Sequence, residues 1–387
     1  MARPTSYRLT SYGDMITNQP RTDAYAQALR QAVRPGGTVL DIGAGTGIFS
    51  LLACQYGAGH VHAVEPDDAI QVARQMAAAN GCSDRITFHQ ALSTAIALPA
   101  PADLIISDLR GVLPLFQHHI PAIADARARL LAPGGVLIPC RDTLWAALVE
   151  DEKSYRPYAE PWLRNDYGLD LSAGQPLAVN SWRKVNAQAD QLLVTPQQWA
   201  TLDYATIESP DVAGELAWTV EQPGTAHALL LWFDAELADG IGFSNAPGGP
   251  ELIYGQAFFP LQTPVALEPG DLVSVQLRAN LTGDDYIWQW RTSVRPAAAH
   301  APPKANFRQS TFLGAPLSPA SLAKREAGYQ PVLDESGQLD RTILALMDGQ
   351  LSLADIAQRV MEAFPQRFSH WRAALAYAGE LSLKYSR

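Results

Sequence analysis

A glycine-rich turn between a buried strand and a helix constrains this chain more than any other part of its sequence. Residues 38–41 predict a buried strand, and Gly43, Gly45 and Gly47 follow it directly. Glycines at alternate positions let the backbone turn tightly and approach a ligand without a Cβ in the way. Residues 48–56 then predict a helix, so the turn is typical of a nucleotide-binding strand–helix unit.

The same alternation of short strands and helices continues to about residue 140. Apolar runs predict further strands at 60–65, 86–91, 103–108 and 135–139. Short strands that alternate with helical segments indicate parallel pairing, because a parallel connection needs a crossover. We therefore expect an α/β, Rossmann-like sheet domain over residues 1–140, with N-terminal helices ahead of the sheet.

Beyond residue 140 the pattern changes to longer runs in which apolar and polar residues alternate. These runs, separated by Gly and Pro turns, are 142–150, 226–237, 255–261, 271–281 and 286–294. They predict an antiparallel β-barrel domain over residues 141–294. Residues 168–204, which are rich in Gln and Ala, interrupt the strands, and we interpret them as an insertion.

The C-terminal part predicts a linker followed by a small helical module. A Pro- and Ala-rich stretch opens the linker, over residues 295–332, and residues 333–387 have the spacing of three short amphipathic helices. Ser352 and Asp355 form a capping box. The module is similar to small winged-helix domains of the PqqD type, which hold a leader peptide. The alternative is a helical bundle that only packs on the barrel.

Composition excludes several classes of function. The formal net charge of −10 argues against binding nucleic acid or an anionic membrane and leaves room for a cationic substrate. The cysteines, Cys54, Cys82 and Cys140, are unclustered, so we expect no disulfide framework and no metal site. The sequence shows no membrane-length apolar run and no signal peptide, so we expect a cytoplasmic protein.

Two nucleotide cofactors compete for the glycine-rich turn. A dinucleotide site has the spacing G-x-G-x-x-G, whereas this turn has G-x-G-x-G with Asp41 two residues before the first glycine. It resembles motif I of class I S-adenosylmethionine methyltransferases, whose acidic residue lies at the methionine end of the cofactor. Glu65 ends the next strand, where a carboxylate can accept both hydroxyls of a ribose. The resemblance implies an enzyme that uses S-adenosylmethionine.

The segment ahead of the sheet narrows the family. Residues 11–15 (Ser-Tyr-Gly-Asp-Met) and 21–25 (Arg-Thr-Asp-Ala-Tyr) resemble the N-terminal helices of protein arginine methyltransferases. Residues 242–247 (Gly-Phe-Ser-Asn-Ala-Pro) resemble a motif in that family's barrel. The resemblance implies a head-to-tail homodimer with residues 168–204 as its dimerisation arm. The cofactor-binding residues that we expect are Met15, Arg21, Asp41, Gly43, Gly45, Gly47, Glu65 and Thr94.

The substrate loop departs from the family pattern. The family has S-E-x-x-G-x-x-x-x-x-E, whose two glutamates clamp the guanidinium of the substrate arginine. Here the shorter Asp108 replaces the first glutamate, the uncharged Gln117 replaces the second, and Arg110 adds a cation. The barrel element T-H-W-x-Q is also altered, with Tyr254 and no histidine.

We interpret the altered loop as a pocket poorly suited to arginine. Asp108 and Gln117 are the candidate catalytic residues, and Arg110 and Tyr254 belong to the substrate loop region. The hypothesis is methyl transfer to a peptide or protein side-chain nitrogen, with a neutral nitrogen such as histidine as a plausible acceptor. One alternative is a small-molecule or carboxylate methyltransferase that uses Arg110. The other is a non-catalytic scaffold that binds the cofactor.

Overall fold

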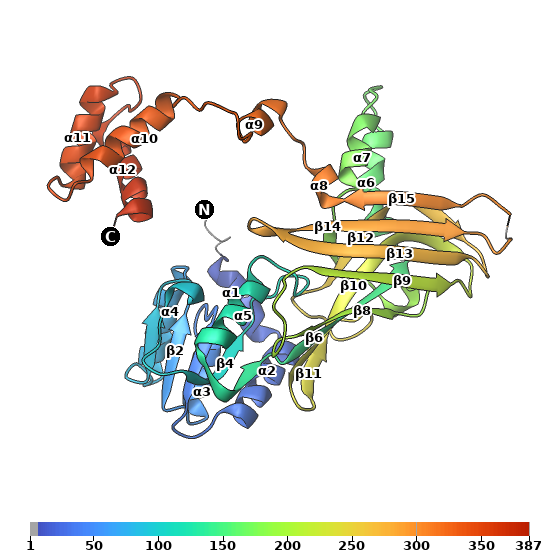
Figure 1. Cartoon of the computed structure of the whole chain (residues 1–387), viewed down its shortest axis with the longest axis horizontal. Coiled ribbons are helices and arrows are strands. Elements are labelled where there is room, and N and C mark those ends of the chain that lie inside the picture. Colours follow the sequence, from blue (N-terminus) through green and yellow to red (C-terminus); the bar gives the residue numbers. More distant parts are fainter. Residues whose placement is uncertain (1–6, 299, 387) are drawn as a thin grey trace. The chain divides into compact units, whose positions relative to one another are not determined.

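The computed structural model describes residues 7–298 and 300–386, and its internal contacts divide the chain into two units, 1–316 and 317–387 (Figure 1). The helices are α1 (Leu9–Thr17), α2 (Gln19–Ala32), α3 (Ile48–Gln55), α4 (Ala69–Ala79), α5 (His119–Arg129), α6 (Glu152–Leu163), α7 (Gln175–Ala178), α8 (Thr311–Gly314), α9 (Pro319–Ala323), α10 (Glu335–Leu346), α11 (Leu353–Ala363) and α12 (Trp371–Tyr385).

The first unit begins with a parallel sheet in the order β3-β2-β1-β4-β5. Its strands are β1 (Thr38–Ile42), β2 (His60–Val64), β3 (Ile86–His89), β4 (Ala102–Ser107) and β5 (Leu131–Ile138). The central strands are buried on both faces, as expected for apolar strands that crossover helices cover. The expectation of a Rossmann-like parallel sheet is confirmed.

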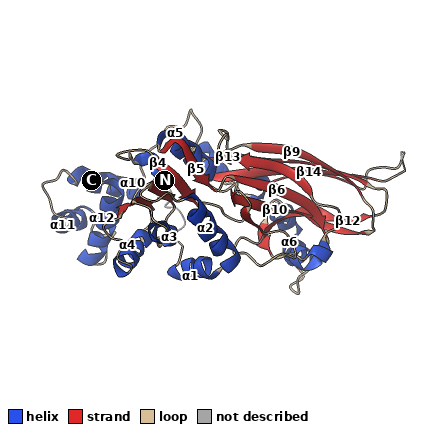
Figure 2. Ribbon diagram, turned by 90° about the horizontal axis from the view of Figure 1, so that it is seen from below, coloured by secondary structure: helices blue, strands red, loops and turns tan. Residues whose placement is uncertain are grey.

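Helix α2 connects the parallel sheet to the strands that follow it. Its buried face, which includes Tyr25, Ala28 and Leu29, packs on α3 and also on β10 (Gly224–Ala238) and β11 (Ile241–Ser244). Figure 2 shows α2 between the helices of the parallel sheet and the antiparallel strands. Residues on α2 therefore face the boundary between the two halves of this unit.

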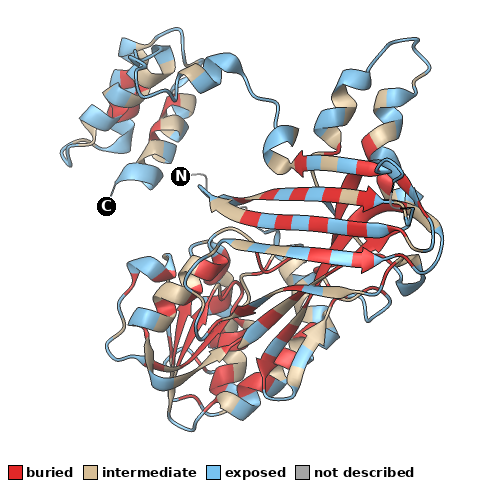
Figure 3. Ribbon diagram, turned by 45° about the vertical axis from the view of Figure 1, so that its right-hand side comes forward, coloured by how far each residue is buried: buried red, intermediate tan, exposed pale blue. Residues whose placement is uncertain are grey.

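Two antiparallel sheets complete the first unit and confirm the predicted change of pattern. One has the order β7-β12-β10-β6-β8 with β11 on β10, and the other has the order β15-β14-β13-β9. Buried and exposed residues alternate along β13 and β14 (Figure 3), and Trp288 and Trp290 are fully buried between the sheets. The strands are β6 (Arg141–Val149), β7 (Arg183–Val185), β8 (Gln197–Asp203), β9 (Val212–Thr219), β12 (Gln256–Leu267), β13 (Leu272–Thr282), β14 (Asp285–Arg295) and β15 (Ala305–Ser310).

The insertion differs in extent from the predicted range of 168–204. Helices α6 and α7 stand out from the strands (Figure 1), with η2 (Ser172–Gly174) between them, so the projecting part starts at Glu152. Residues 183–185 and 197–203 instead form β7 and β8, which pair with β12 and β6. The prediction is therefore wrong for the second half of the range, because those residues complete the sheet.

The predicted linker of 295–332 is also too long. Residues 305–310 form β15, which pairs with β14, and α8 follows directly. Ala305 and Gln309 are buried while Asn306 and Arg308 are exposed, a strand alternation that the prolines at 302 and 303 obscured. The chain therefore stays part of the first unit as far as residue 316.

The second unit consists of helices around a small core of its own. Leu339, Ile343, Ile356 and Val360 form that core between α10, α11 and α12. The capping box of Ser352 and Asp355 is present at the start of α11. Residues 317–386, as far as the structure describes them, contain no strand, so the winged-helix part of the prediction has no support. No helix among the described residues has the length and apolar character needed to span a membrane.

Candidate active site

The glycine-rich turn adopts the backbone that its sequence predicts. Gly43, Gly45 and Gly47 have φ angles of 74°, 54° and 87°, in the left-handed region that favours glycine. A Cβ on Gly45 would lie 2.5 Å from the ring of Tyr12, so the α1 segment covers this turn closely. The turn thus leads from β1 into α3, with its backbone N–H groups at the carboxyl edge of the sheet.

Glu65 follows β2 and faces the same turn. Its Oε2 accepts a hydrogen bond from Gly45 N at 3.0 Å, and its Oε1 accepts one from Asp67 N at 2.9 Å. Burial raises the pKa of Glu65, and the two backbone hydrogen bonds oppose that rise. Because an ionised carboxylate has about four acceptor positions, each oxygen can still accept a ligand hydroxyl.

Asp41 is fully buried at the end of β1. Its Oδ2 accepts a hydrogen bond from Ser50 Oγ at 2.6 Å, while Oδ1 has no hydrogen-bond partner within the described residues. Burial raises the pKa of Asp41 to about 7, although the hydrogen bonds from Ser50 lower it. A buried acceptor without a partner is costly, so Oδ1 indicates a place for a donor from a ligand.

The remaining predicted cofactor residues occupy different positions. Arg21 lies buried on α2, and its Nη1 donates to the backbone oxygen of Met15 at 3.2 Å, which fixes the end of α1. Thr94 lies exposed in η1 (Ser93–Ala95), after β3 and away from these contacts. The structure therefore brings Arg21 and Met15 together and leaves Thr94 outside the group.

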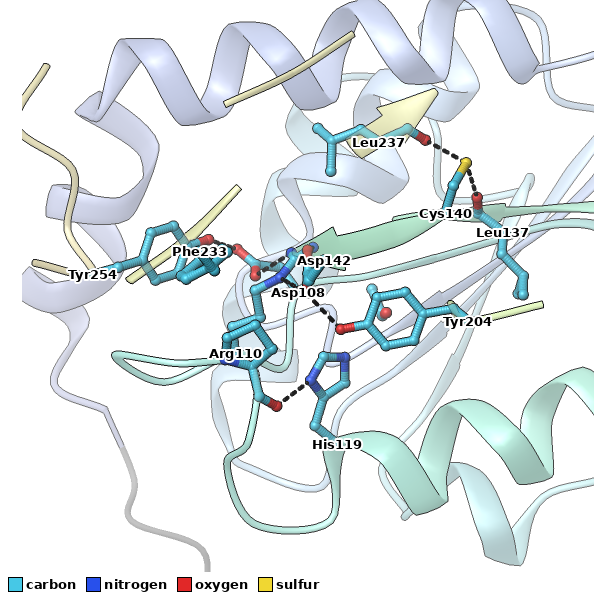
Figure 4. Close-up of polar contacts among 12 residues, drawn as sticks. Asp108, Arg110, His119, Leu137, Cys140, Asp142, Tyr204, Phe233, Leu237 and Tyr254 are labelled. Atoms are coloured by element: carbon cyan, nitrogen blue, oxygen red, sulfur yellow. Dashed lines mark hydrogen bonds and ion pairs between the residues drawn. The ribbon is translucent and has the colours of Figure 1, made fainter. Parts of the chain in front are cut away.

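Asp108, directly after β4, contacts three side chains, of which Figure 4 labels Arg110 and Tyr254. Its Oδ2 accepts hydrogen bonds from Arg21 Nε at 2.7 Å and from the Tyr254 hydroxyl at 2.6 Å. Its Oδ1 lies 3.2 Å from Nη1 of Arg110. Burial alone would raise the pKa of Asp108, but the two guanidinium groups and Tyr254 hold it below its usual value. Asp108 is therefore ionised at neutral pH.

Arg110 has its strongest contacts in the barrel. Its Nε and Nη2 donate to the two oxygens of Asp142, at 2.8 and 2.7 Å, in a bidentate pair with both side chains fully buried. Its Nη1 also donates to the hydroxyl of Tyr25 at 2.6 Å, and the hydroxyl of Tyr204 donates to Asp142 at 2.5 Å. The sequence analysis places Arg110 in the substrate loop as an added cation but misses Asp142, its nearest charged partner.

Gln117 does not join this network. The partners of the Asp108 carboxylate are Arg21, Arg110 and Tyr254, and Gln117 lies where the loop turns into α5, half-buried, with a φ of 42°. That angle is uncommon for a residue with a side chain, so the loop holds Gln117 in a strained conformation.

Asp142 is the functional residue that sequence reasoning missed most clearly. It occupies an inward position of β6, in the same alternation as Leu144 and Ala146, which are both fully buried. A carboxylate at an inward position of a barrel strand needs a buried partner. A carboxylate among the inward apolar residues of β6 was therefore the sequence signal for a buried ion pair, whose partner is Arg110.

The side chains Arg21, Asp108, Arg110 and Asp142 form a buried cluster in which two positive charges balance two negative ones. Such a cluster carries no net charge to attract a cation, although it fixes the substrate loop firmly. An ionised carboxylate held by two arginines is a poor proton acceptor. Asp108 can therefore orient a reacting group but is unsuited to remove its proton.

Comparison with known proteins gives the same two-part architecture. The sequence model of the ribosomal protein L11 methyltransferase (PrmA) family matches residues 18–139, and that of the arginine methyltransferase oligomerization subdomain matches residues 141–293. Human protein arginine N-methyltransferase 2 is 31% identical over 300 residues, which cover 73% of this chain and 68% of the human protein. The chain belongs to the protein arginine N-methyltransferase family. This membership confirms the expected class, the S-adenosylmethionine-dependent methyltransferases.

Other relatives agree with this assignment. An arginine N(omega)-methyltransferase of Streptomyces achromogenes subsp. streptozoticus is 28% identical over 270 residues, 68% of this chain and 74% of that protein. The chain spans only 54% of a further relative, a probable protein arginine N-methyltransferase 6 of Arabidopsis thaliana. The Trypanosoma brucei PRMT1 enzyme–prozyme complex with AdoHcy has a TM-score of 0.70 at 22% identity, covering 78% of this chain and 98% of that one, which shows a common fold.

Proposed function

We propose that the protein transfers a methyl group from S-adenosylmethionine to a neutral side-chain nitrogen of a peptide or protein. Membership of the arginine methyltransferase family supports the methyl donor and the general reaction. The observation that carries the choice of acceptor is the position of Asp108 between Arg21 and Arg110, which cancels the negative charge that a guanidinium needs.

The residues at the sheet edge fit S-adenosylmethionine. Glu65 keeps free acceptor positions for two ribose hydroxyls, and the left-handed glycines leave the turn without side chains. The unpartnered Oδ1 of Asp41 matches an ammonium donor at the methionine end. AdoHcy in the trypanosomal relative is the demethylated form of the same cofactor.

The bound cofactor would supply a methyl group on a positively charged sulfur, which passes to the lone pair of the acceptor nitrogen. The chain's own residues position that nitrogen and exclude water from it. The side chain of Asp108, directly after β4, is 6% exposed, and Tyr254, just before β12, is buried beside it; these two groups can accept from or donate to the acceptor. Because Asp108 stays ionised, its part is orientation and electrostatic support rather than proton removal.

A guanidinium would lose binding energy in this pocket. Each charge-assisted hydrogen bond that it fails to form costs about 1.5–3 kcal/mol, which corresponds to roughly 10- to 100-fold in rate. Arg110 lies 3.2 Å from Asp108 and repels a second cation, while Gln117, outside that network, brings no negative charge. A neutral imidazole needs no compensating charge and keeps a free lone pair above its pKa.

Two matched peptides test the acceptor. The full chain, with labelled S-adenosylmethionine, is offered peptides identical except for one histidine or one arginine, with free arginine as a third sample. We expect the histidine peptide to be labelled at least tenfold faster than the arginine peptide. Faster labelling of either arginine sample would contradict the argument from Asp108 and Arg110.

The alternatives have less support. Every N–H-bearing nitrogen of Arg110 already donates to Asp142, Tyr25 or Asp108, so it has little capacity left for an acceptor carboxylate. A small-molecule acceptor is favoured by the name of the Streptomyces relative, which the free-arginine sample tests directly. A non-catalytic scaffold would bind the cofactor by calorimetry but label none of the samples. Whether residues 333–387 hold a peptide stays a prediction.

We also propose that the projecting helices α6 and α7 form the arm of a homodimer, consistent with the match to the oligomerization subdomain. The arm bears exposed large apolar side chains close together in sequence, at Leu163, Tyr167, Leu169, Leu171 and Leu177. An exposed apolar group of this size is typical of an interface.

Polar substitution at the arm tip is expected to give a monomer. The double change Leu163→Ser and Leu169→Ser removes apolar surface without touching β7 or β8, because these side chains are 58% and 61% exposed. Sedimentation velocity measures the oligomeric state of the variant. The control Leu272→Ser alters a 52% exposed leucine on the barrel and should leave the dimer intact. If the double variant is still a dimer, the arm is not the dimer interface.

Cofactor affinity is expected to increase with pH up to about 7. Burial holds the pKa of Asp41 at about 7, so the carboxyl is protonated in a growing fraction of molecules below that pH. Only the ionised form attracts an ammonium group, so the Kd for AdoHcy should rise up to tenfold for each pH unit below 7. Calorimetry between pH 5.5 and 8 measures the Kd for AdoHcy. Asp41→Asn should bind more weakly at pH 8 and lose the dependence, and an unchanged dependence in that variant would exclude Asp41 as its source.

A further inference from the structure

Three histidines gather on the neighbouring strands β2 and β3 of the parallel sheet. His60 and His62 lie on one face of β2, and His89 ends the neighbouring strand β3. Together with Thr38 and Thr87 they line a solvent-accessible depression of about 440 Å³. None of the proposed roles in methyl transfer uses these side chains.

The closest contact in the group joins two ring nitrogens. Nδ1 of His62 lies 3.1 Å from Nε2 of His89, and the two ring centroids are 5.3 Å apart. The ring of His60 lies 4.8 Å from that of His62, but its Nε2 is engaged with the hydroxyl of Thr87 at 2.9 Å. The pair of His62 and His89 therefore presents two adjacent nitrogens, with His60 beside it.

We propose that His62 Nδ1 and His89 Nε2 form a binding site for a divalent transition-metal cation of the class that prefers imidazole, such as Zn²⁺ or Ni²⁺. Metal–nitrogen bonds of about 2.0–2.1 Å at right or tetrahedral angles place two ligand nitrogens roughly 2.9–3.4 Å apart. The observed separation lies within that interval. No group of three or more His, Cys, Asp or Glu side chains in the described part of the chain is arranged to hold a metal ion, so water completes the coordination.

Binding requires no net loss of protons. At present one ring donates its hydrogen to the other across the 3.1 Å contact. When a cation takes both lone pairs, that hydrogen moves to the far nitrogen of its own ring, and both rings remain neutral.

A cation at this site would connect β2 to β3 close to the cofactor. The backbone N–H of Glu65 donates to the backbone carbonyl of His89 at 3.1 Å, so the residue that carries one proposed ligand is hydrogen-bonded through its main chain to the residue proposed to bind the ribose. A ligand that binds only the folded state stabilises it by RT ln(1 + [L]/Kd), so the stability rises with the logarithm of the ligand concentration. The site therefore predicts a metal-dependent rise in the unfolding temperature.

Zinc titration of the full chain tests the proposal. After treatment with a chelator, the wild-type protein is titrated with ZnCl₂ by calorimetry, and its unfolding temperature is measured with and without zinc. We expect His62→Gln and His89→Gln each to weaken binding at least tenfold and to remove the rise in unfolding temperature. The control is His300→Gln, which alters an exposed histidine between β14 and β15. It should bind zinc as the wild type does.

Three results would overturn the proposal. These are no binding by the wild type at millimolar zinc, equal binding by the two variants and the wild type, or a tenfold loss in His60→Gln, which would make His60 a ligand. Circular dichroism checks that each variant is folded. If the His62→Gln variant is unfolded, the zinc affinity of His89→Gln alone tests the proposal, because His89 is only half-buried, at the rim of the depression.

Discussion

Replacing Asp108 by alanine is expected to lower kcat by about a thousandfold while cofactor binding survives. Asp108 is the point where Arg21, Arg110 and Tyr254 meet, and it lies at the end of β4. Its loss removes the group that we propose to orient the acceptor, and it leaves the guanidinium groups of Arg21 and Arg110 without this carboxylate. Removing one preorganised electrostatic contact in an enzyme site costs about 10²–10³ in kcat, and here positioning is lost as well.

Two further variants separate charge from shape. Asp108→Asn keeps the size of the side chain without its charge and should be nearly as inactive as alanine, whereas Asp108→Glu keeps the charge and should recover part of the rate. Calorimetry with AdoHcy checks that the cofactor still binds. If the kcat of the alanine variant is within threefold of the wild-type kcat, Asp108 has no part in the mechanism.

The pH profile distinguishes orientation from proton removal. Because Arg21 and Arg110 hold the pKa of Asp108 below its ordinary value, the carboxylate is ionised between pH 5 and 7. Asp108 should therefore contribute no rise in kcat between pH 5 and 7. An acidic limb that disappears in Asp108→Asn would show that the carboxylate titrates during turnover and acts as a base.

The sequence specifies the cofactor half of the site well, because its signals are local. Gly43, Gly45 and Gly47 must occupy left-handed backbone conformations, and their spacing within one turn shows this without knowledge of the rest of the fold. Glu65 follows the next apolar strand and reaches the turn by way of parallel pairing. The positions of the glycine turn and of Glu65 both follow from the alternation of strands and helices, which the periodicity of apolar residues in the sequence indicates directly.

The substrate half was less predictable, because its contacts join distant elements. Asp142 and Arg110 are separated by 32 positions in the chain, and their pairing depends on how β6 follows the parallel sheet. Tyr204 reaches Asp142 from the end of β8, a segment that composition had assigned to the insertion. Strand signals in 183–203 and 305–310 were short or next to prolines, so periodicity alone could not identify them.

Removing the charge of Arg110 is expected to destabilise the first unit by about 3–5 kcal/mol, because it leaves Asp142 buried without its cation. Both side chains are fully buried and joined by two short hydrogen bonds, and only Tyr204 would still donate to the carboxylate. For a unit of this size the unfolding temperature should fall on the order of 10 °C. Arg110→Met is the suitable change, since methionine fills much of the same volume.

A double-variant cycle shows whether the pair itself causes the loss. Arg110→Met with Asp142→Leu removes both charges, so we expect a smaller loss than for Arg110→Met alone, since a buried pair offers little net stability over apolar residues. The matched control is Arg129→Met, which removes the partly exposed pair with Asp125 and two hydrogen bonds to backbone carbonyls, and it should destabilise the unit much less than Arg110→Met. Thermal unfolding followed by the buried barrel tryptophans, including Trp288 and Trp290, measures all of these variants. If Arg110→Met is as stable as Arg129→Met, then Asp142 tolerates burial alone, and the pair does not fix the substrate loop to the barrel.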